Sequence, residues 1–368
     1  MDRRVLIIPT GGLRREGITS SILTFMRFMD RSGLDIRVAA VYNNEPDVLS
    51  EFKSLGCAIV ETPDRRSETT EYARFLFSYM RRERIDVVHV HGSSSVMAIE
   101  LRLAQLAGVK ERIAHSRNTK SDDPRRDRVL RPLFRHSWTR ALACGEDAGK
   151  WLFEDSHYEV LHNGHDLSGL AFDPLKRMSM RARLALKDEP TIGFVGNINY
   201  VKNQTFLIQV FDAISRKMPN ARLFIIGDGP DRSKIEAIIQ EKKLGSRVVI
   251  TGRISNVNDY LQAMDVMMLP SLFEGLPNVV LEWQASGLPC IVSDVVTREC
   301  AVAKLVRFVS LDRGAEYWAN CACGFFESTE TDCNGRCEAS ESACRSLRSH
   351  GFDIKNASAR LREIYLGE

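Results

Sequence analysis

The stretch Asp265-Val-Met-Met-Leu-Pro-Ser-Leu-Phe-Glu-Gly-Leu-Pro-Asn278 decides the fold of the second half of this chain. It opens with a short apolar run that predicts a buried strand, and we expect a helix to begin near Gly275 and to run to about Ser286. A strand followed directly by a helix is the repeating unit of a parallel sheet with helices on both faces. The stretch therefore predicts an α/β fold.

The same alternation of strand and helix extends in both directions from this stretch. The expected strands are residues 5–9, 35–41, 58–61, 86–90, 112–115, 141–144 and 158–161, then 191–195, 222–226, 247–250, 265–269 and 290–293. Helical periodicity lies between them, for example at residues 20–29, 72–84, 97–107 and 356–365. A polar passage around 166–188 separates the two series. Two doubly wound domains are predicted, over 1–165 and 166–354, with the terminal helix 355–368 joined to the first.

Composition excludes several classes of protein. The chain has 368 residues, of which 44% are hydrophobic and 27% charged, as in ordinary globular proteins and unlike disordered or fibrous ones. Its net charge of +3 is too small for a dedicated nucleic-acid binder. No apolar run approaches the ~20 residues of a membrane helix, and the N-terminus lacks the ~7–15-residue apolar core of a signal peptide. We expect a cytoplasmic protein.

The nine cysteines are expected to be free thiols. Five of them crowd residues 321–344, where the spacings are C-x-C and C-x-x-x-C. A zinc ribbon needs paired C-x-x-C knuckles, and these are missing from the sequence. We assign no metal to this stretch.

Two glutamates flank the helix start expected at 275–278. Glu274 follows the strand, and Glu282 lies two turns into the expected helix. Unpaired backbone N–H groups at a helix start suit a phosphate or sugar oxygen, and the two carboxylates suit the hydroxyls of a sugar or ribose. The alternative is structural, with one glutamate completing a helix cap and the other solvated. Spacing alone leaves both interpretations open.

This region resembles the donor-site signature of retaining glycosyltransferases of family 4, which have the GT-B fold. The two glutamates follow Leu-Pro-Ser and precede Ala-Ser-Gly-Leu-Pro-Cys-Ile-Val-Ser-Asp, as in that family. Further segments agree in order, and the resemblance covers residues 5–317 and is closest to the branch that makes bacterial exopolysaccharide and capsule. These segments are Val88-His-Val-His-Gly92, Ala114-His-Ser-Arg-Asn118, His162-Asn-Gly164, Val195-Gly-Asn-Ile-Asn-Tyr-Val-Lys-Asn203 and Ile226-Gly-Asp-Gly-Pro230.

The resemblance implies a reaction and its substrates. It implies two Rossmann-like domains with the active site in the cleft between them, and transfer of a sugar with retention. The donor would be a nucleotide-diphosphate sugar, most often a UDP-sugar in this branch, and the acceptor a glycan or lipid-linked saccharide. No Asp-x-Asp triplet occurs in the chain, so no metal and no cofactor are expected.

The resemblance also implies roles for individual residues. Glu274 matches the residue that holds donor-sugar hydroxyls, Glu282 the one that binds the ribose, and Lys202 the lysine that neutralises the diphosphate. His115 matches the histidine that reaches the sugar from the first domain. The remaining expected contacts are the helix start at Gly275, Leu276, Pro277 and Asn278, and the first-domain phosphate or acceptor loop with Arg15 and Gly17.

The sequence departs from the family at two places. Gly196-Asn197 stands where the family usually has Gly-Arg, so one of two cations on the diphosphate is missing. We expect another cation to substitute for it; the candidates are Arg14, Arg15, Arg117 and Arg253. The loop at residues 15–19 also departs, because the branch commonly has paired glycines and a glutamate there.

Other features gave further expectations. We expect His89 and His91 to face opposite sides of their strand, with His89 packed in the core and His91 nearer the cleft. Gly227-Asp-Gly229 lacks the third glycine of a dinucleotide fingerprint and is rejected as one. Residues 112–140 carry nine Lys or Arg, including Lys120, against three Asp. This block is either a solvated helix face or a contact with anionic lipid.

Two other functions stay open at this point. One is a nucleotide-sugar epimerase of GT-B-like fold, against which the spacing of the two glutamates argues. The other is a catalytically weak nucleotide-sugar-binding subunit of a polysaccharide assembly, for which Asn197 is the hint.

Overall fold

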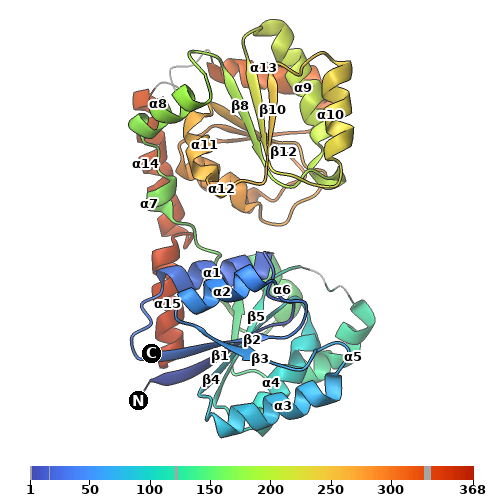
Figure 1. Ribbon diagram of the computed structural model, residues 1–368, viewed down its shortest axis with the longest axis vertical. Helices are drawn as coiled ribbons and strands as arrows, with labels where there is room; N and C mark the ends of the chain where they lie inside the picture. The colour runs from blue at the N-terminus through green and yellow to red at the C-terminus, as the bar shows by residue number, and fades with distance from the viewer. Residues whose placement is uncertain (1, 16, 120, 122, 327–332) are drawn as a thin grey trace. The chain divides into compact units, whose positions relative to one another are not determined.

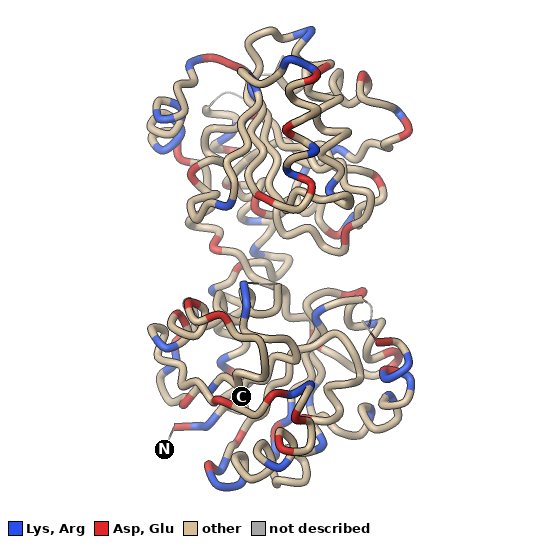
Figure 2. The backbone as a smooth tube through the Cα atoms, turned by 45° about the vertical axis from the view of Figure 1, so that its right-hand side comes forward, with Lys and Arg blue, Asp and Glu red and all other residues tan. Residues whose placement is uncertain are grey.

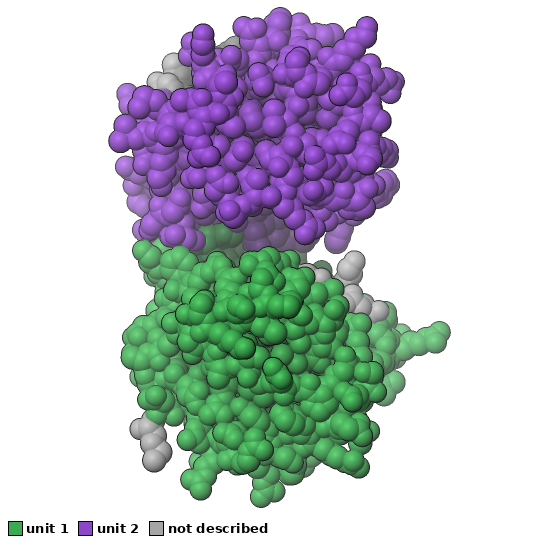
Figure 3. Space-filling model, in the orientation of Figure 1, with its two compact units in different colours: residues 1–165, 351–368 green, residues 166–350 purple. Residues whose placement is uncertain are grey.

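The computed structural model describes residues 2–15, 17–119, 121, 123–326 and 333–368. The chain divides into two compact units (Figure 3). Unit 1 comprises Met1–His165 and Gly351–Glu368, and unit 2 comprises Asp166–His350. No helix among the described residues is long and apolar enough to cross a membrane.

Unit 1 is built on a seven-stranded parallel sheet (Figure 1). Its order is β3-β2-β1-β4-β5-β6-β7. The strands are β1 (Arg3–Pro9), β2 (Leu34–Ala40), β3 (Ala58–Glu61), β4 (Val87–Gly92), β5 (Glu111–Ser116), β6 (Arg140–Ala143) and β7 (Glu159–Val160). The helices are α1 (Gly17–Phe28), α2 (Pro46–Ser54), α3 (Thr69–Arg82), α4 (Ala98–Leu106), α5 (Pro124–Phe134), α6 (Glu146–Phe153) and α15 (Ile354–Leu366).

The apolar runs of this sheet are continuous because both faces are buried. In β1, Val5 and Ile7 belong to the core beneath α1, α2 and α15, whereas Leu6 and Ile8 belong to the core beneath α3 and α4. All four side chains are fully buried. Neighbouring residues of a strand point to opposite faces, so one apolar segment serves two layers of helices.

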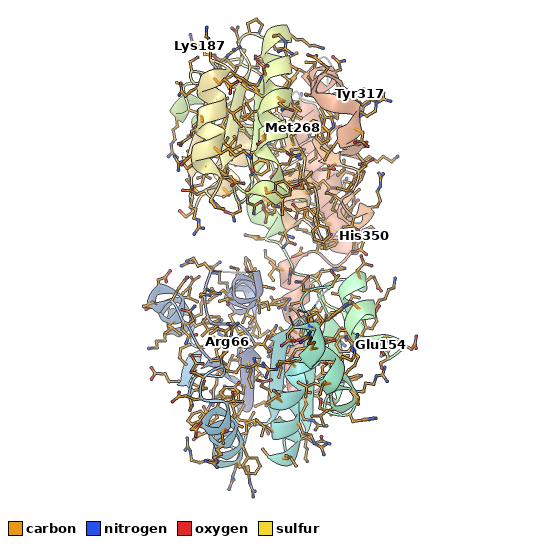
Figure 4. All side chains as sticks on the ribbon, turned by 90° about the vertical axis from the view of Figure 1, so that its right-hand side faces the viewer. Arg66, Glu154, Lys187, Met268, Tyr317 and His350 are labelled. Atoms are coloured by element: carbon orange, nitrogen blue, oxygen red, sulfur yellow. The ribbon has the colours of Figure 1, made fainter. Side chains whose placement is uncertain are left out.

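Unit 2 has a six-stranded parallel sheet with the same winding. Its order is β10-β9-β8-β11-β12-β13. The strands are β8 (Thr191–Val195), β9 (Arg222–Ile226), β10 (Val248–Gly252), β11 (Val266–Leu269), β12 (Cys290–Ser293) and β13 (Val306–Val309). The helices are α7 (Leu167–Leu170), α8 (Pro174–Arg183), α9 (Gln204–Lys217), α10 (Arg232–Glu241), α11 (Val257–Ala263), α12 (Asn278–Ala285), α13 (Gly314–Phe326) and α14 (Cys333–Ser349). Met268 of β11, labelled in Figure 4, lies fully buried in the interior of this unit.

The predicted α/β class and the doubly wound sheets are confirmed. The structure adds β13 and the helices α13 and α14, which the sequence did not lead us to expect. The cysteine-rich stretch lies on these two helices. Between its cysteines, the fully buried Arg336 of α14 donates to the backbone oxygens of Ser286, Leu261 and Met264. Burial lowers the pKa of Arg336 to about 9, and its hydrogen bonds attach α14 to the carboxyl ends of α11 and α12.

Candidate active site

Two residues predicted to bind the donor contact each other in unit 2. Lys202 ends a short 3₁₀ turn (Tyr200–Lys202) after β8, and Glu274 lies in the loop between β11 and α12. Lys202 Nζ donates to Glu274 Oε1 at 2.5 Å, and Ser271 Oγ donates to the same oxygen at 2.8 Å. The side chains of Lys202 and Glu274 are only 19% and 14% exposed. Because β8 and β11 are neighbours in the sheet, the loops at their carboxyl ends meet.

Three hydrogen bonds of ordinary length fix the loop that carries Lys202. Asn199 Oδ1 accepts from the backbone N–H of Lys202 at 3.0 Å. Asn203 adopts the left-handed region with φ 55°, and its Nδ2 donates to the oxygen of Pro270 at 3.2 Å. The backbone N–H of Leu272 donates to the oxygen of Val201 at 2.8 Å. The loops that follow β8 and β11 are therefore held to each other by one backbone hydrogen bond and by the side chain of Asn203, and the Lys202–Glu274 pair lies on these loops.

Glycines 196, 227 and 229 allow the backbone to pack closely beneath this loop. Gly227 has φ 146°, and a Cβ there would lie 2.0 Å from the backbone oxygen of Gly196. A Cβ on Gly229 would lie 2.2 Å from the oxygen of Ile198. The Gly-Asp-Gly motif therefore serves backbone packing under the site.

The helix start lies within the predicted range 275–278, at its last residue. α12 begins at Asn278, with Pro277 at its N-cap, and no side chain caps it. The helix does not begin earlier because Pro277 disfavours the helical conformation at the residue before it, Leu276. Glu274 bonds Lys202 instead of capping the helix, so the capping alternative fails. A Cβ on Gly275 would meet nothing within 4 Å, so the loop in front of α12 is open.

The other predicted donor residues lie in loops that follow strands of the unit 2 sheet and on α12. Asn197 is exposed in the loop after β8, and the half-buried Glu282 lies on α12. Leu276 is half-buried between Gly275 and Pro277. Arg253 is exposed directly after β10 and makes no side-chain hydrogen bond or ion pair with the residues that the structure describes. Of the candidate cations, it alone belongs to unit 2.

The other three candidate cations lie in unit 1. Arg15 is exposed and forms ion pairs with Asp47 and Glu51. Gly17 begins α1, and Glu16 lies outside the described residues. Arg117 is half-buried, and its guanidinium donates to Asn163 Oδ1 at 2.6 Å and to His91 Nδ1 at 3.1 Å. Burial lowers the pKa of Arg117 to about 10. A guanidinium held by Asn163 and His91 in this way is not a cation available to the donor.

The prediction that His89 and His91 face opposite sides is wrong. Their ring centroids lie 3.9 Å apart. Side chains alternate with a period of two along a strand, so residues two apart share a face. Both belong to the face of β4 that packs under α1 and α15. His115 of β5, the neighbouring strand, lies opposite His91 in the sheet register.

These three histidines form a buried hydrogen-bonded cluster. His89 Nδ1 lies 2.7 Å from Tyr365 Oη, and His89 Nε2 lies 3.1 Å from His115 Nδ1. Arg117 Nε donates to His91 Nδ1 at 3.1 Å. Burial lowers the pKa of each histidine well below its ordinary value. His115 has no exposed surface, so the structure places it in this cluster and does not present it to a sugar.

The geometry of the cluster invites comparison with a metal site. The three histidines bring ligand nitrogens within 4.8 Å of one another. Arg117 is always a donor, so His91 must accept through Nδ1 and keep its proton on Nε2. That tautomer leaves no nitrogen of His91 free to bind a cation, and the charge of Arg117 lies beside it. The donor set therefore fits a neutral hydrogen-bonded cluster better than a metal centre.

Comparison with known proteins identifies the family. Residues 189–316 match the family described as "Glycosyl transferases group 1". The chain is 34% identical over 338 residues to the putative glycosyltransferase EpsF of Bacillus subtilis (strain 168), which covers 86% of each protein. It is 28% identical over 243 residues to the Escherichia coli protein named UDP-Gal:alpha-D-GlcNAc-diphosphoundecaprenol alpha-1,3-galactosyltransferase, which covers 62% of each.

The fold also matches solved structures. The crystal structure of Alr3699/HepE from Anabaena in complex with UDP covers 99% of this chain and 100% of HepE, with a TM-score of 0.79 at 14% identity. Two Rossmann-like parallel sheets that match such structures give this chain the GT-B fold. The chain belongs to the group 1 family of glycosyltransferases. Its membership of a transferase family argues against both the epimerase and the catalytically weak binding subunit.

Proposed function

We propose that this glycosyltransferase moves a sugar from a nucleotide-diphosphate sugar to a glycan or lipid-linked saccharide in cell-surface polysaccharide synthesis. A UDP-sugar is the first candidate donor, since UDP is bound in HepE and UDP-Gal is named as the donor of the Escherichia coli relative. The observation that carries the proposal is the contact between Lys202 and Glu274. This contact brings together a cation that can bind the diphosphate and a carboxylate that can accept hydrogen bonds from sugar hydroxyls.

The proposed reaction is that of retaining family 4 enzymes. The bond from the anomeric carbon of the sugar to the diphosphate oxygen breaks. The acceptor oxygen bonds to that carbon on the same face, and the acceptor's proton passes to the leaving phosphate. Lys202 and the backbone N–H groups in front of α12 stabilise the charge that develops on the diphosphate. Glu274 holds the sugar, and Glu282 holds the ribose. We propose that no metal ion or other cofactor is needed to stabilise this negative charge.

The experiment that tests the proposal is a thermal-shift panel with UDP, GDP, ADP and their sugar conjugates. A ligand at 100 times its Kd stabilises the folded protein by ~2.7 kcal/mol. We expect a shift with one nucleotide, lost in Glu282→Ala and kept in Glu241→Ala, a matched change on the exposed end of α10. A wild-type protein that responds to none of these nucleotides would contradict the proposal.

We also propose a peripheral contact with anionic membrane through α5. This helix carries Arg125, Arg126, Arg128 and Arg131, and Arg135 follows it (Figure 2). Val129 is 76% exposed and Leu133 is 39% exposed on the same helix. These apolar side chains give the basic block the anchor that charge alone lacks. Lys120 and Asp122 of the block lie outside the described residues.

A further inference from the structure

Ser271 is a fully buried serine that contacts the Lys202–Glu274 pair. It follows Pro270 directly after β11 and lies three residues before Glu274. Its Oγ donates to Glu274 Oε1 at 2.8 Å, and the same oxygen accepts from Lys202 Nζ. Within the described part of the chain, this is the one side-chain hydrogen bond of Ser271. A buried hydroxyl is unfavourable unless it is hydrogen-bonded, so this serine is tied to the carboxylate of Glu274.

The backbone on either side of Ser271 is held to the loop that follows β8. The oxygen of Pro270 accepts from Asn203 Nδ2 at 3.2 Å, and the N–H of Leu272 donates to the oxygen of Val201 at 2.8 Å. A group that orients another side chain does so accurately only when it is itself held in place. The hydroxyl of Ser271 meets this condition, because the residues before and after it are both fixed.

The carboxylate of Glu274 keeps positions free for a ligand. Among the described residues, two groups donate to it, and both use Oε1. Burial raises the pKa of the Cys300 thiol to about 12, and the nearby charge of Glu274 adds to this shift. That thiol donates to the oxygen of Thr297 at 3.1 Å. An ionised carboxylate accepts about four hydrogen bonds, so Glu274 can keep its bond from Ser271 and still accept from sugar hydroxyls.

A bound donor would affect the two contacts of Glu274 differently. A diphosphate carries more negative charge than a carboxylate and competes with Glu274 for the ammonium group of Lys202. The hydroxyl of Ser271 is uncharged and buried, so it stays with Glu274. A glutamate side chain released from every contact would regain its rotamers, and its carboxylate would no longer be oriented when the sugar arrives. Ser271 is the contact that prevents this release.

We propose that Ser271 is a positioning residue, whose hydroxyl keeps the carboxylate of Glu274 directed at the hydroxyls of the donor sugar once the diphosphate has drawn Lys202 away. Ser271 acts only through Glu274 and touches no substrate. The inference rests on the proposed function for the roles of Glu274 and Lys202. It adds that Ser271 serves the sugar half of the donor and not the nucleotide half.

The first experiment separates the two halves of the donor. UDP, UDP-glucose and UDP-galactose are titrated calorimetrically into the full-length wild type and into Ser271→Ala. For the UDP-sugar that the wild type binds more tightly, we expect Ser271→Ala to lose about fivefold to tenfold in affinity, from one charge-assisted hydrogen bond. Its affinity for UDP should equal that of the wild type. Loss of both affinities, or of neither, would overturn the proposal.

The matched control is Ser215→Ala. Ser215 is a buried serine of α9, and its Oγ donates to the backbone oxygen of Asp212 at 2.8 Å. This change removes a buried hydroxyl from unit 2 without touching Glu274. We expect its affinities for UDP and for the UDP-sugar to equal those of the wild type.

The second experiment tests whether Ser271 acts through Glu274. In Glu274→Ala there is no carboxylate to orient, so adding Ser271→Ala should change the UDP-sugar affinity by less than about twofold. A further loss of about fivefold would overturn the proposal, because Ser271 would then act through the fold. Ser271→Thr keeps a hydroxyl and should restore the wild-type affinity. Urea unfolding shows whether its methyl group fits this buried position, and if it does not, the double variant decides alone.

Failure of this inference and failure of the proposed function give different results. A wild type that binds UDP-sugars, with Ser271→Ala equal to the Ser215→Ala control, overturns the role of Ser271 and leaves the proposed function standing. If the thermal-shift panel selects GDP or ADP, that nucleotide and its glucose conjugate take the place of the uridine probes. A wild type that binds no nucleotide contradicts the proposed function and removes the role of Ser271 with it.

Discussion

Lys202 and Glu274 form an ion pair in unit 2, with the ammonium nitrogen 2.5 Å from a carboxylate oxygen. The cation predicted to meet the diphosphate is therefore already neutralised by the carboxylate predicted to meet the sugar. A bound donor would take over both partners, since its phosphates replace Glu274 at Lys202 and its hydroxyls replace Lys202 at Glu274. Nucleotide binding and sugar binding are then coupled through one contact.

Substitutions at this pair should separate binding from turnover. Lys202→Ala removes the cation and should weaken UDP binding about tenfold or more. Glu274→Gln frees Lys202 for the diphosphate, so UDP should bind as tightly as in the wild type or more tightly. Turnover in Glu274→Gln should fall about a hundredfold, as when a transition-state contact is lost. Calorimetry with UDP and initial rates measure the two effects.

The control for these variants is Glu316→Gln, which breaks an exposed ion pair with Arg216 elsewhere in unit 2. It should leave UDP affinity and turnover unchanged. Equal loss of UDP affinity in Lys202→Ala and Glu274→Gln would show that the two residues do not have separate roles.

Asn197→Arg should restore the family's second diphosphate cation. Asn197 is exposed in the loop after β8, so an arginine fits without burying its charge. We expect UDP to bind about fivefold to tenfold more tightly, from one added charge-assisted hydrogen bond. Gln240→Arg, on exposed α10, adds the same charge at a distance and is the control. If both variants bind UDP alike, Asn197 does not face the diphosphate.

Gly227→Ala should destabilise unit 2. Its φ of 146° disfavours any side chain, and the new Cβ would lie 2.0 Å from the oxygen of Gly196. We expect a loss of about 2–4 kcal/mol in the free energy of unfolding, since the backbone beneath the Lys202 loop must move. Urea unfolding measures this. Gly275→Ala, where a Cβ would meet nothing within 4 Å, should unfold like the wild type.

The histidine cluster should make unit 1 sensitive to acid. The folded protein keeps His89, His91 and His115 neutral, with pKa values well below 6.5, whereas the unfolded chain binds protons at about 6.5. The unfolded state thus binds more protons below pH ~6.5, so stability is full above that pH and falls below it. Three such groups give a slope of up to about 4 kcal/mol per pH unit.

Removal of one titrating ring tests this slope. His91→Asn keeps an acceptor near the position of Nδ1 and should reduce the slope by about 1.4 kcal/mol per pH unit. His136→Asn, at an exposed histidine after α5, should leave it unchanged. Urea unfolding between pH 7 and pH 5 gives both slopes, and identical slopes in the two variants would mean that His91 takes up a proton while folded.

Membrane binding should depend on the exposed apolar residues of α5. Val129→Ser with Leu133→Ser should reduce sedimentation with vesicles that contain anionic lipid about tenfold, since each buried methylene contributes ~0.8 kcal/mol. Leu175 and Met178 of α8 are also exposed, at 72% and 67%. The same serine changes there are the control. Equal binding by both variants would leave α5 as a solvated helix face.

Sequence patterns predicted most strands because buried parallel strands are continuous apolar runs. β8, β9 and β12 begin and end where the pattern placed them. β13 escaped prediction because it is a sheet-edge strand with the exposed Arg307 in its centre. α14 escaped because its sequence is rich in cysteine and serine and poor in large apolar residues. The buried Arg336, and not an apolar stripe alone, holds α14 in place.

The site was predictable as a set of residues and not as a set of contacts. Lys202 and Glu274 are 72 residues apart, and their meeting follows from the strand order, which no local pattern contains. His115 matched a family position, but it bonds the buried His89, which in turn bonds Tyr365 of α15, near the end of the chain. The prediction put the side chains of His89 and His91 on opposite faces of β4. Residues two apart in a strand lie on the same face, so the period of the strand already contradicts that prediction.

Unit 1 is interrupted by the whole of unit 2, and this has a consequence for synthesis. α15 packs in the core of unit 1, where Tyr365 bonds His89. The ribosome makes α15 only after it has made every residue of unit 2. Until the second unit has been made, the core beneath α1 and α2 therefore lacks the part of its cover that α15 supplies. A stop codon or frameshift late in the gene would damage the unit that was made first.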